Sequence, residues 1–155
     1  MSIFKELGFQ PETERPSEAV LYSLARTTTL LTKALTPHYR RHGLTPASLN
    51  VLMVVKHVGG KTGLSQQAIG SRLIISNSNV TGLIDRLERQ SLLTRTPSRR
   101  DRREKVIQIT AKGSKLLDQL WPGHLDTTHR LTACLTAEEK ATLVRLLDKL
   151  RARVG

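Results

Sequence analysis

Apolar residues recur at helical spacing along the first forty residues of the chain. Those that fall on one stripe of a long helix, at intervals of four and seven, are Val20, Leu24, Leu31 and Leu35. Pro37 is expected to kink or end this helix because proline lacks a backbone N–H, and Gly43 is expected to close the turn that follows. The pattern predicts a helical segment within residues 1–43 whose apolar stripe has no obvious partner elsewhere in the chain.

The next stretch, LTPASLNVLMVVKHVGG, is almost continuously apolar and predicts a central helix with Thr45 as its N-cap and Pro46 at its first position. Two shorter helices are predicted after it, SQQAIGSRLI with Ser65 as its N-cap and SNSNVTGLIDRLERQS with Ser76 as its N-cap. The inner face of the second helix is formed by Val80, Leu83, Ile84 and Leu87. Because only a few residues separate these two helices, they must meet at an angle.

Alternating apolar and polar residues then predict a short β-hairpin with strands LLTRT and KVIQIT. Two more helices follow, KGSKLLDQLWPGHLDTTHRLTACL and TAEEKATLVRLLDKLR, and a capping box of Thr136 and Glu139 opens the second. This last helix has its own apolar stripe, made of Leu143, Leu147, Leu150 and Val154. The predicted fold is mainly α with a small β-hairpin.

The excess of positive charge indicates that the protein binds a polyanion. The 155 residues contain 25 Lys and Arg against 13 Asp and Glu, which gives a net charge of +12. Such an excess favours nucleic acid or an anionic membrane surface, and charge alone does not choose between them. The N-terminus lacks the pattern of a signal peptide, and no stretch approaches the ~20 apolar residues of a membrane helix. We therefore expect a soluble, cytoplasmic protein without a membrane partner.

Two short helices joined by a tight turn and followed by a basic hairpin form a winged helix-turn-helix, whose second helix enters the major groove of DNA. Opposite its apolar face, the second helix presents mostly small polar or cationic residues: Ser78, Thr81, Gly82, Asp85 and Arg89, with Asn79 and Arg86 at the flanks. Such residues suit base edges and phosphates, although any solvated helix face is polar. The helix residues predicted to bind DNA are Ser65, Gln66, Asn77, Ser78, Asn79, Thr81 and Arg86.

The loop between the two strands carries four arginines and a single carboxylate. The arginines are Arg99, Arg100, Arg102 and Arg103, and they are predicted to bind DNA. A hairpin tip with this charge repels itself unless solvent or a phosphate backbone screens it, and a narrow minor groove attracts arginine. An ordinary solvated loop is the alternative interpretation. Asp101 is predicted to position a neighbouring arginine, since phosphates repel a carboxylate.

The residues from about position 44 to 113 resemble the winged-helix core of the MarR family of bacterial regulators. The resemblance lies in LTPASLNVL, in SNSNVTGLIDRLERQSLL and in the wing signature D-x-R-x6-T-x-x-G, present as Asp101, Arg103, Thr110 and Gly113. It implies a DNA-binding domain at 44–113 between dimerisation helices in 1–43 and 114–155. It also implies that Arg103 enters the minor groove. Gly82 departs from the family, in which many relatives carry a longer, often basic side chain at this position.

The resemblance further implies a homodimer on a pseudo-palindromic operator, with half-sites about 10 base pairs apart. The residues predicted to hold the dimer together are Val20, Leu24, Leu143, Leu147 and Leu150. Family members are usually repressors whose DNA affinity changes when a small molecule, often phenolic, or an oxidant acts on them. We expect such an effector to enter between the winged helix and the dimer arms, near Gly43, Trp121 and Pro122.

Several other patterns are better explained without a ligand. The segment GGKTG would need glycine instead of Val55 to form a phosphate-binding loop, so a turn is expected. His38 and His42 share a helix face but lack further metal ligands nearby. Trp121 beside Pro122 is expected to pack a helix kink rather than stack on a ligand.

The sequence does not predict a catalytic or redox-active side chain. Cys134, the only cysteine, is expected to be a buried or inert thiol rather than a redox sensor, and no spacing typical of catalysis is present. The chain is predicted to be neither an enzyme nor a binder of a metal or cofactor. The sequence therefore indicates a sequence-specific transcriptional regulator, a repressor released by a small molecule. The alternative is a non-catalytic architectural protein that binds DNA without sequence specificity.

Overall fold

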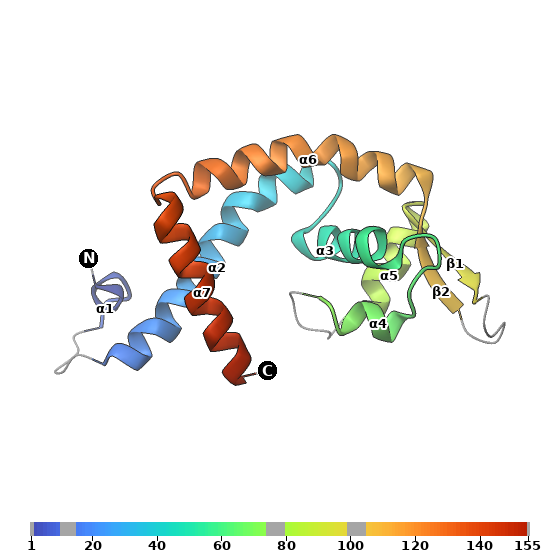
Figure 1. The fold of residues 1–155 in the computed structure, drawn as a ribbon. Coiled ribbons are helices and arrows are strands. Elements are labelled where there is room, and N and C mark those ends of the chain that lie inside the picture. The colour runs from blue at the N-terminus through green and yellow to red at the C-terminus, as the bar shows by residue number, and fades with distance from the viewer. Residues whose placement is uncertain (1, 10–14, 74–79, 99–104, 155) are drawn as a thin grey trace.

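The computed structural model describes residues 2–9, 15–73, 80–98 and 105–154. The elements in chain order are α1 (Ile3–Glu6), α2 (Pro16–Arg40), α3 (Pro46–Val54), the π-helical turn η1 (Val55–Gly59), α4 (Gln66–Gly70), α5 (Val80–Arg89), β1 (Leu93–Pro97), β2 (Lys105–Ile109), α6 (Ala111–Leu131) and α7 (Ala137–Val154). Helix α6 spans the molecule, with α3 to β2 beneath one half and α2 with α7 beneath the other (Figure 1). The predicted fold class, mainly α with a two-stranded hairpin, is confirmed.

The core is aliphatic and lies where α3, α4, α5, the hairpin and the first half of α6 meet. Its side chains with no measurable exposure include Leu52, Ile69, Ile84, Leu87 and Leu120. The inner face predicted for α5 is confirmed, because Val80, Ile84 and Leu87 are buried and Leu83 packs partly buried against them. Burial of such apolar surface holds the two short helices at a fixed angle on one support.

The helix boundaries in this region follow from capping residues. The Thr45 hydroxyl accepts a hydrogen bond from the Ser48 N–H, and the Ser65 hydroxyl accepts one from the Ala68 N–H, so both predicted N-caps are confirmed. The capping box at the start of α7 is also present. There the Glu139 carboxylate accepts from the Thr136 N–H at 2.8 Å, and the Thr136 hydroxyl accepts from the Glu139 N–H at 3.2 Å. Ser76, the third predicted N-cap, lies outside the described residues.

The hairpin pairs β1 with β2 antiparallel, from Leu93 opposite Ile109 to Pro97 opposite Lys105. Leu64 adds an isolated bridge to Ile107, on the edge of β2 away from β1. Gly63 precedes this bridge with φ +76°, and a Cβ there would lie 2.8 Å from the Ile107 carbonyl oxygen. The GGKTG segment is therefore a turn that leads into the sheet, as predicted, and glycine is required at its end.

Helix α2 continues through Pro37 to Arg40, so of the two outcomes expected at this proline, a kink or an end, the end is wrong. Buried Tyr39 anchors the last turn to the core. Gly43, with φ +70°, closes the following turn as predicted. Cys134 was expected to be buried or inert, and the structure shows it exposed, so the buried alternative is wrong. It lies in the short connection between α6 and α7.

Candidate nucleic-acid interface and adjoining surfaces

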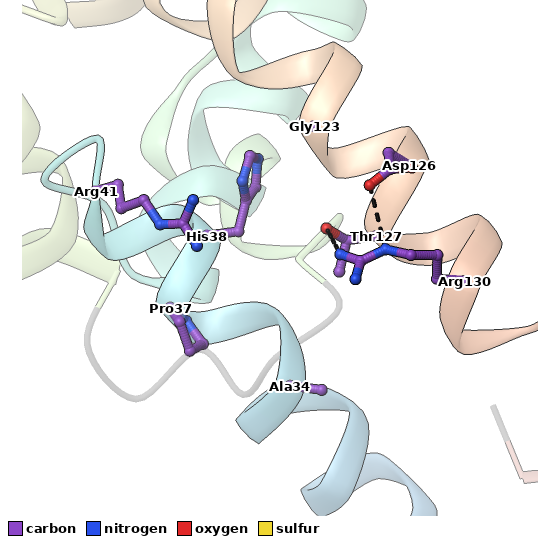
Figure 2. A pocket seen from close by; sticks show the side chains of 8 residues that line it. All are labelled: Ala34, Pro37, His38, Arg41, Gly123, Asp126, Thr127 and Arg130. Carbon is purple, nitrogen blue, oxygen red and sulfur yellow. Dashed lines mark hydrogen bonds and ion pairs between the residues drawn. The ribbon is translucent and has the colours of Figure 1, made fainter.

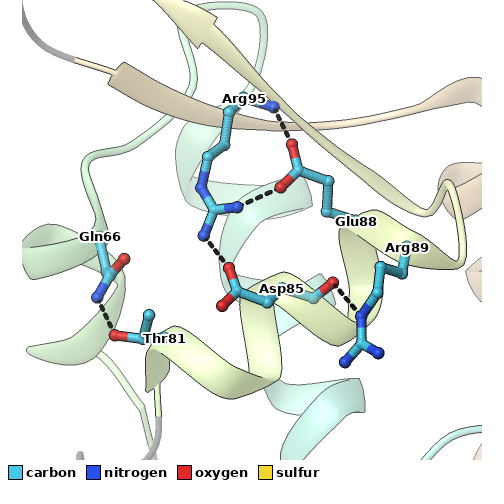
Figure 3. Close-up of polar contacts among 6 residues, drawn as sticks. All are labelled: Gln66, Thr81, Asp85, Glu88, Arg89 and Arg95. Atoms are coloured by element: carbon cyan, nitrogen blue, oxygen red, sulfur yellow. Dashed lines mark hydrogen bonds and ion pairs between the residues drawn. The ribbon is translucent and has the colours of Figure 1, made fainter.

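The start of α4 and the start of α5 contact each other through two of the residues predicted to bind DNA. The Gln66 side-chain amide donates to the Thr81 hydroxyl at 2.6 Å, and both residues are exposed (Figure 3). Ser65 is exposed beside them and caps α4. This bond links the start of α4 to the start of α5 at the surface, opposite the buried face of α5. The structure thus brings three predicted residues together at one edge of the helix pair.

The outer face of α5 also exposes the cations Arg86 and Arg89. The Arg89 guanidinium bonds to the carbonyl oxygen of Asp85, one turn earlier, at 3.4 Å. Gly82 is partly exposed on the same helix. A polar, positively charged helix face without large apolar groups is suited to a groove lined by phosphates and base edges. Three further predicted residues, Asn77, Ser78 and Asn79, lie outside the described residues.

Arg95 of β1 lies against the carboxylates of α5, and sequence reasoning missed it. Its guanidinium donates to the carboxylates of both Asp85 and Glu88, and its backbone N–H donates to Glu88 at 3.2 Å (Figure 3). The hydrogen bond to Asp85, with the two carboxylate charges, raises the pKa of Arg95 above its ordinary value. Asp85, expected to face the groove, is instead turned toward the hairpin. The available signal was that Arg95 stands two residues after Leu93, where the alternation of the strand predicts an inward-facing apolar residue.

The second half of the wing signature has a structural role. The Thr110 hydroxyl caps α6 by accepting from the Gly113 N–H at 3.0 Å, and it donates to the Ser91 carbonyl oxygen at 2.8 Å. A Cβ on Gly113 would lie 2.3 Å from the Leu92 carbonyl oxygen, so only glycine permits this approach. The first half of the signature and its neighbours, Arg99, Arg100, Asp101, Arg102 and Arg103, lie outside the described residues.

Helices α2 and α7 form an apolar groove of about 690 Å³, here called the arm groove. Its lining residues are Ala19, Val20, Ser23, Leu24, Leu143, Leu146, Leu147, Lys149, Leu150 and Arg153. All five residues predicted for dimerisation are among them. Every residue of α7 is described by the structure, and none is buried. A helix of 18 residues with an apolar stripe and no buried side chain needs a further surface to cover it.

The junction between α2 and α6 contains a polar pocket of about 280 Å³ (Figure 2). It is lined by Ala34, Pro37, His38, Arg41, Gly123, Asp126, Thr127 and Arg130. The His38 ring is 3.1 Å from the Leu120 carbonyl oxygen through Nε2, and it lies so close to α6 that a Cβ on Gly123 would be 2.5 Å from its Cε1. The Arg130 side chain pairs with Asp126 at 3.2 Å. The two helices are therefore joined by direct contact beneath this pocket.

Aromatic and imidazole rings continue along the same junction. Burial and the neighbouring His38 lower the pKa of His124, whereas burial raises the pKa of Tyr39. The Tyr39 hydroxyl and Nδ1 of His124 share a hydrogen bond of 3.0 Å. Trp121 packs on His124 with ring centroids 4.8 Å apart, and α6 runs on through Pro122.

Trp121 and Pro122 also line a pocket of about 210 Å³, together with Met53, Lys56, His57, Leu117 and Asp118. Lys56 pairs with Asp118 at 2.6 Å across this pocket, which links η1 to α6. His38 and His42 lie with ring centroids 5.6 Å apart. Within the described ranges no three His, Cys, Asp or Glu side chains gather as metal ligands would. Over the same ranges, every helix is too short or too polar to cross a membrane.

The chain was compared with protein families, with related proteins and with solved structures. Residues 42–104 match the model of the MarR family. The HTH-type transcriptional regulator MhqR of Bacillus subtilis is 33% identical over 118 residues, which cover 76% of this chain and 77% of MhqR. BpsR of Bordetella bronchiseptica, whose DNA binding is regulated by 6-hydroxynicotinic acid, is 24% identical with a TM-score of 0.79, over 90% of this chain and 97% of BpsR. MepR of S. aureus, solved with DNA, is 21% identical with a TM-score of 0.75, over 86% of this chain and 95% of MepR.

The similarity to BpsR and MepR shows a common fold that includes both the winged helix and the arms. The match to the family model extends from the turn after α2 through α5 to the wing, and the relation to MhqR covers three quarters of the chain. The chain, a DNA-binding transcriptional regulator and not an enzyme, therefore belongs to the MarR family.

Proposed function

We propose that the protein is a homodimeric, sequence-specific repressor that a small aromatic molecule releases from its operator. The observation that carries this proposal is the pairing of two surfaces: an outward, polar and cationic face on α5, and a hairpin whose connecting segment carries four arginines. The functional segments are 1–43, 44–113 and 114–155. A regulator of this kind acts in the cytoplasm, where the chromosome is accessible in bacteria.

The proposed DNA contacts divide between the two grooves. Helix α5 and the residues before it enter the major groove, where Thr81 and Arg86 meet base edges and phosphates and Ser65 with Gln66 contacts the backbone. The wing arginines at 99, 100, 102 and 103 grip the phosphates and the minor groove, and Asp101 orients one of them. MepR, which shares the fold, has been solved with DNA. An architectural protein that binds by charge alone has no use for such a defined helix face.

The proposed dimer covers the arm groove. A second copy would supply its own α2 and α7, so that Val20 and Leu24 of one protomer pack with Leu143, Leu147 and Leu150. The dimer carries 2 × (+12) = +24 charges, which favours association with DNA. Two winged helices on one dimer fit a pseudo-palindromic operator with half-sites about one helical turn, or 10 base pairs, apart.

The proposed effector is a small aromatic or phenolic compound bound where the arms join the winged helix. The pocket beside Trp121 offers an aromatic face and the Lys56 ammonium, and the pocket beside His38 offers the Arg41 guanidinium. DNA binding by BpsR, which shares the fold, responds to an aromatic acid. Such a ligand releases DNA only if it binds more tightly to the arrangement that does not fit the operator.

The decisive experiment compares operator and random DNA. The operator is first identified by selection of bound sequences from a random duplex library, and affinities are then measured over a range of salt concentrations. A specific regulator should prefer its operator to random duplex by about 10³-fold or more. Arg103→Ala should cost about 1–3 kcal/mol and change preference where the minor groove is narrow.

Arg100→Ala serves as the matched variant for general phosphate contact. It should weaken binding to all sequences and lower the salt slope by about 2 × 0.9 = 1.8 for the two copies in a dimer. Circular dichroism confirms that each variant folds. Equal affinity for operator and random duplex in the parent protein would refute sequence-specific regulation and leave the architectural function. Failure of aromatic acids and phenols to bind or to change operator affinity would refute the effector.

A further inference from the structure

The recognition helix α5 carries two carboxylates on a surface that would approach a polyanion. Asp85 and Glu88 lie one turn apart, and their side chains are 48% and 36% exposed. Carboxylates near DNA phosphates are repelled, and the repulsion grows as water is displaced from the interface. A regulator with this helix therefore needs something to neutralise these groups or to hold them away from the phosphates.

Arg95, on the neighbouring strand, both neutralises these carboxylates and holds them in place. It pairs across the hairpin with Ile107, so its side chain lies on the same face as this buried residue and is only 23% exposed. From that position its guanidinium reaches Asp85 with one nitrogen and Glu88 with another. The planar fork of arginine can bridge two carboxylates in this way, whereas the single ammonium of lysine cannot hold the same geometry.

The backbone takes part in the same contact. The edge of β2 beyond Ile107 is bonded to Leu64, whereas the Arg95 N–H points to the outer edge of β1 and donates to Glu88. Glu88 thus binds both the main chain and the side chain of one residue. These three hydrogen bonds join α5 to the first strand of the wing.

We propose that Arg95 is a positioning residue for DNA recognition: it fixes α5 to the wing and neutralises Asp85 and Glu88, without itself contacting DNA. This role rests on the proposed function of α5 as the helix that enters the major groove. With Arg95 in place, Arg86 and Arg89 face DNA without competition from two free carboxylates. Without it, those carboxylates are released next to the phosphates, and the angle between helix and wing loses its main polar link.

The test uses the full-length protein, the selected operator and a random duplex. Arg95→Met should lower operator affinity by about tenfold or more. Adding Asp85→Asn and Glu88→Gln to this variant should recover most of that loss, because the released carboxylates are then gone. Arg151→Met on α7 is the matched control, since it also removes one arginine paired with a carboxylate, that of Asp148, and it should bind like the parent.

Two more variants separate positioning from direct contact with DNA. Arg95→Lys keeps the charge but not the bridge, so it should bind operator several-fold more weakly than the parent. A residue that simply touched a phosphate would tolerate lysine. Asp85→Asn with Glu88→Gln, in the presence of Arg95, should raise affinity for random duplex, steepen its salt dependence and reduce the preference for operator. A purely structural ion pair would leave that preference unchanged.

The outcomes also distinguish this role from the function it rests on. If the parent shows no operator preference, the proposed function fails. If the parent shows the preference but the triple variant binds as weakly as Arg95→Met, or Arg95→Lys equals the parent, only the role of Arg95 is overturned. Should Arg95→Met fail to fold by circular dichroism, Arg95→Lys and the double carboxylate variant still decide the question.

Discussion

Helix α5 of the winged helix and helix α7 of the arm carry similar apolar stripes, but one stripe is buried and the other is exposed. On α5 the stripe is covered, and Ile84 and Leu87 have no exposed surface. On α7 the stripe remains open, and Leu143 and Val154 are 45% and 78% exposed. The periodicity of apolar residues thus predicts that a helix face will be buried, but it does not show whether the same chain or another chain buries it. The winged helix completes its core alone, whereas α7 leaves its stripe open, and we propose that a second copy covers it.

The sharpest way to break this comparison is to place charges in the arm groove. Leu147→Glu with Leu150→Glu should prevent dimerisation, since each carboxylate would be buried in an apolar interface. A single winged helix then loses the second half-site, and operator affinity should fall by roughly 10²- to 10⁴-fold. Analytical ultracentrifugation and operator titration measure the two effects.

Ala141→Glu with Ala152→Glu is the control for added charge, because both alanines are exposed on α7 outside the groove. This variant should remain a dimer and bind operator with an affinity reduced only by its altered net charge. A stable dimer in the Leu147 and Leu150 variant would show that another surface joins the protomers.

Helix α6 has one glycine at the winged helix and one at the junction with α2, so adding a single Cβ at each compares the packing of the two regions. Gly113→Ala should lower the free energy of unfolding by about 3 kcal/mol, because the added Cβ meets the Leu92 backbone, which cannot move freely. Gly123→Ala should cost less, about 1–2 kcal/mol, because the His38 ring can rotate away. Urea unfolding at one protein concentration measures both. Equal losses would mean that the arm junction is packed as rigidly as the core.

The smallest expected effect is the pH response of the arm junction. The pKa of His124 is lowered in the folded protein, so near and below its ordinary value of 6.5 the unfolded chain binds the proton more readily. The stability that this group contributes is present above that value and is lost as the pH falls through the lowered pKa. Between pH 7.5 and 5, the parent should lose up to about 4 °C more in Tm than His124→Gln. An identical pH response in both proteins would remove His124 as its source.

Local signals in the sequence were enough for most of the winged helix. Thr45, Ser65 and Thr136 each cap a helix within three residues of the group they bond, and such short-range chemistry is readable along the chain. The stripe on α5 was equally local. The hairpin followed from alternation, and the predicted strand bounds differ from the observed ones by at most one residue.

What sequence reasoning missed depends on contacts between distant segments. Asp85 looked like a groove-facing residue because helical geometry alone cannot show a cation that a neighbouring strand supplies. The pocket beside His38 depends on the crossing of α2 and α6, which lie about eighty residues apart in the chain. Cys134 was expected to be buried or inert because free thiols usually are, and its place between α6 and α7 leaves it exposed. The DNA contacts and the dimer residues remain predictions for experiment.

Helix α6 begins at the base of the wing, immediately after its cap at Thr110, and ends next to the connection that leads to α7. At 1.5 Å per residue, its 21 residues form a rod of about 31 Å. A tilt of about 10° at the arm end would move the wing end by roughly 5 Å on such a rod. That displacement exceeds the 3.4 Å rise of one base pair along a DNA strand. A change of about 10° in the angle of α6 is therefore enough to move a wing out of step with the duplex.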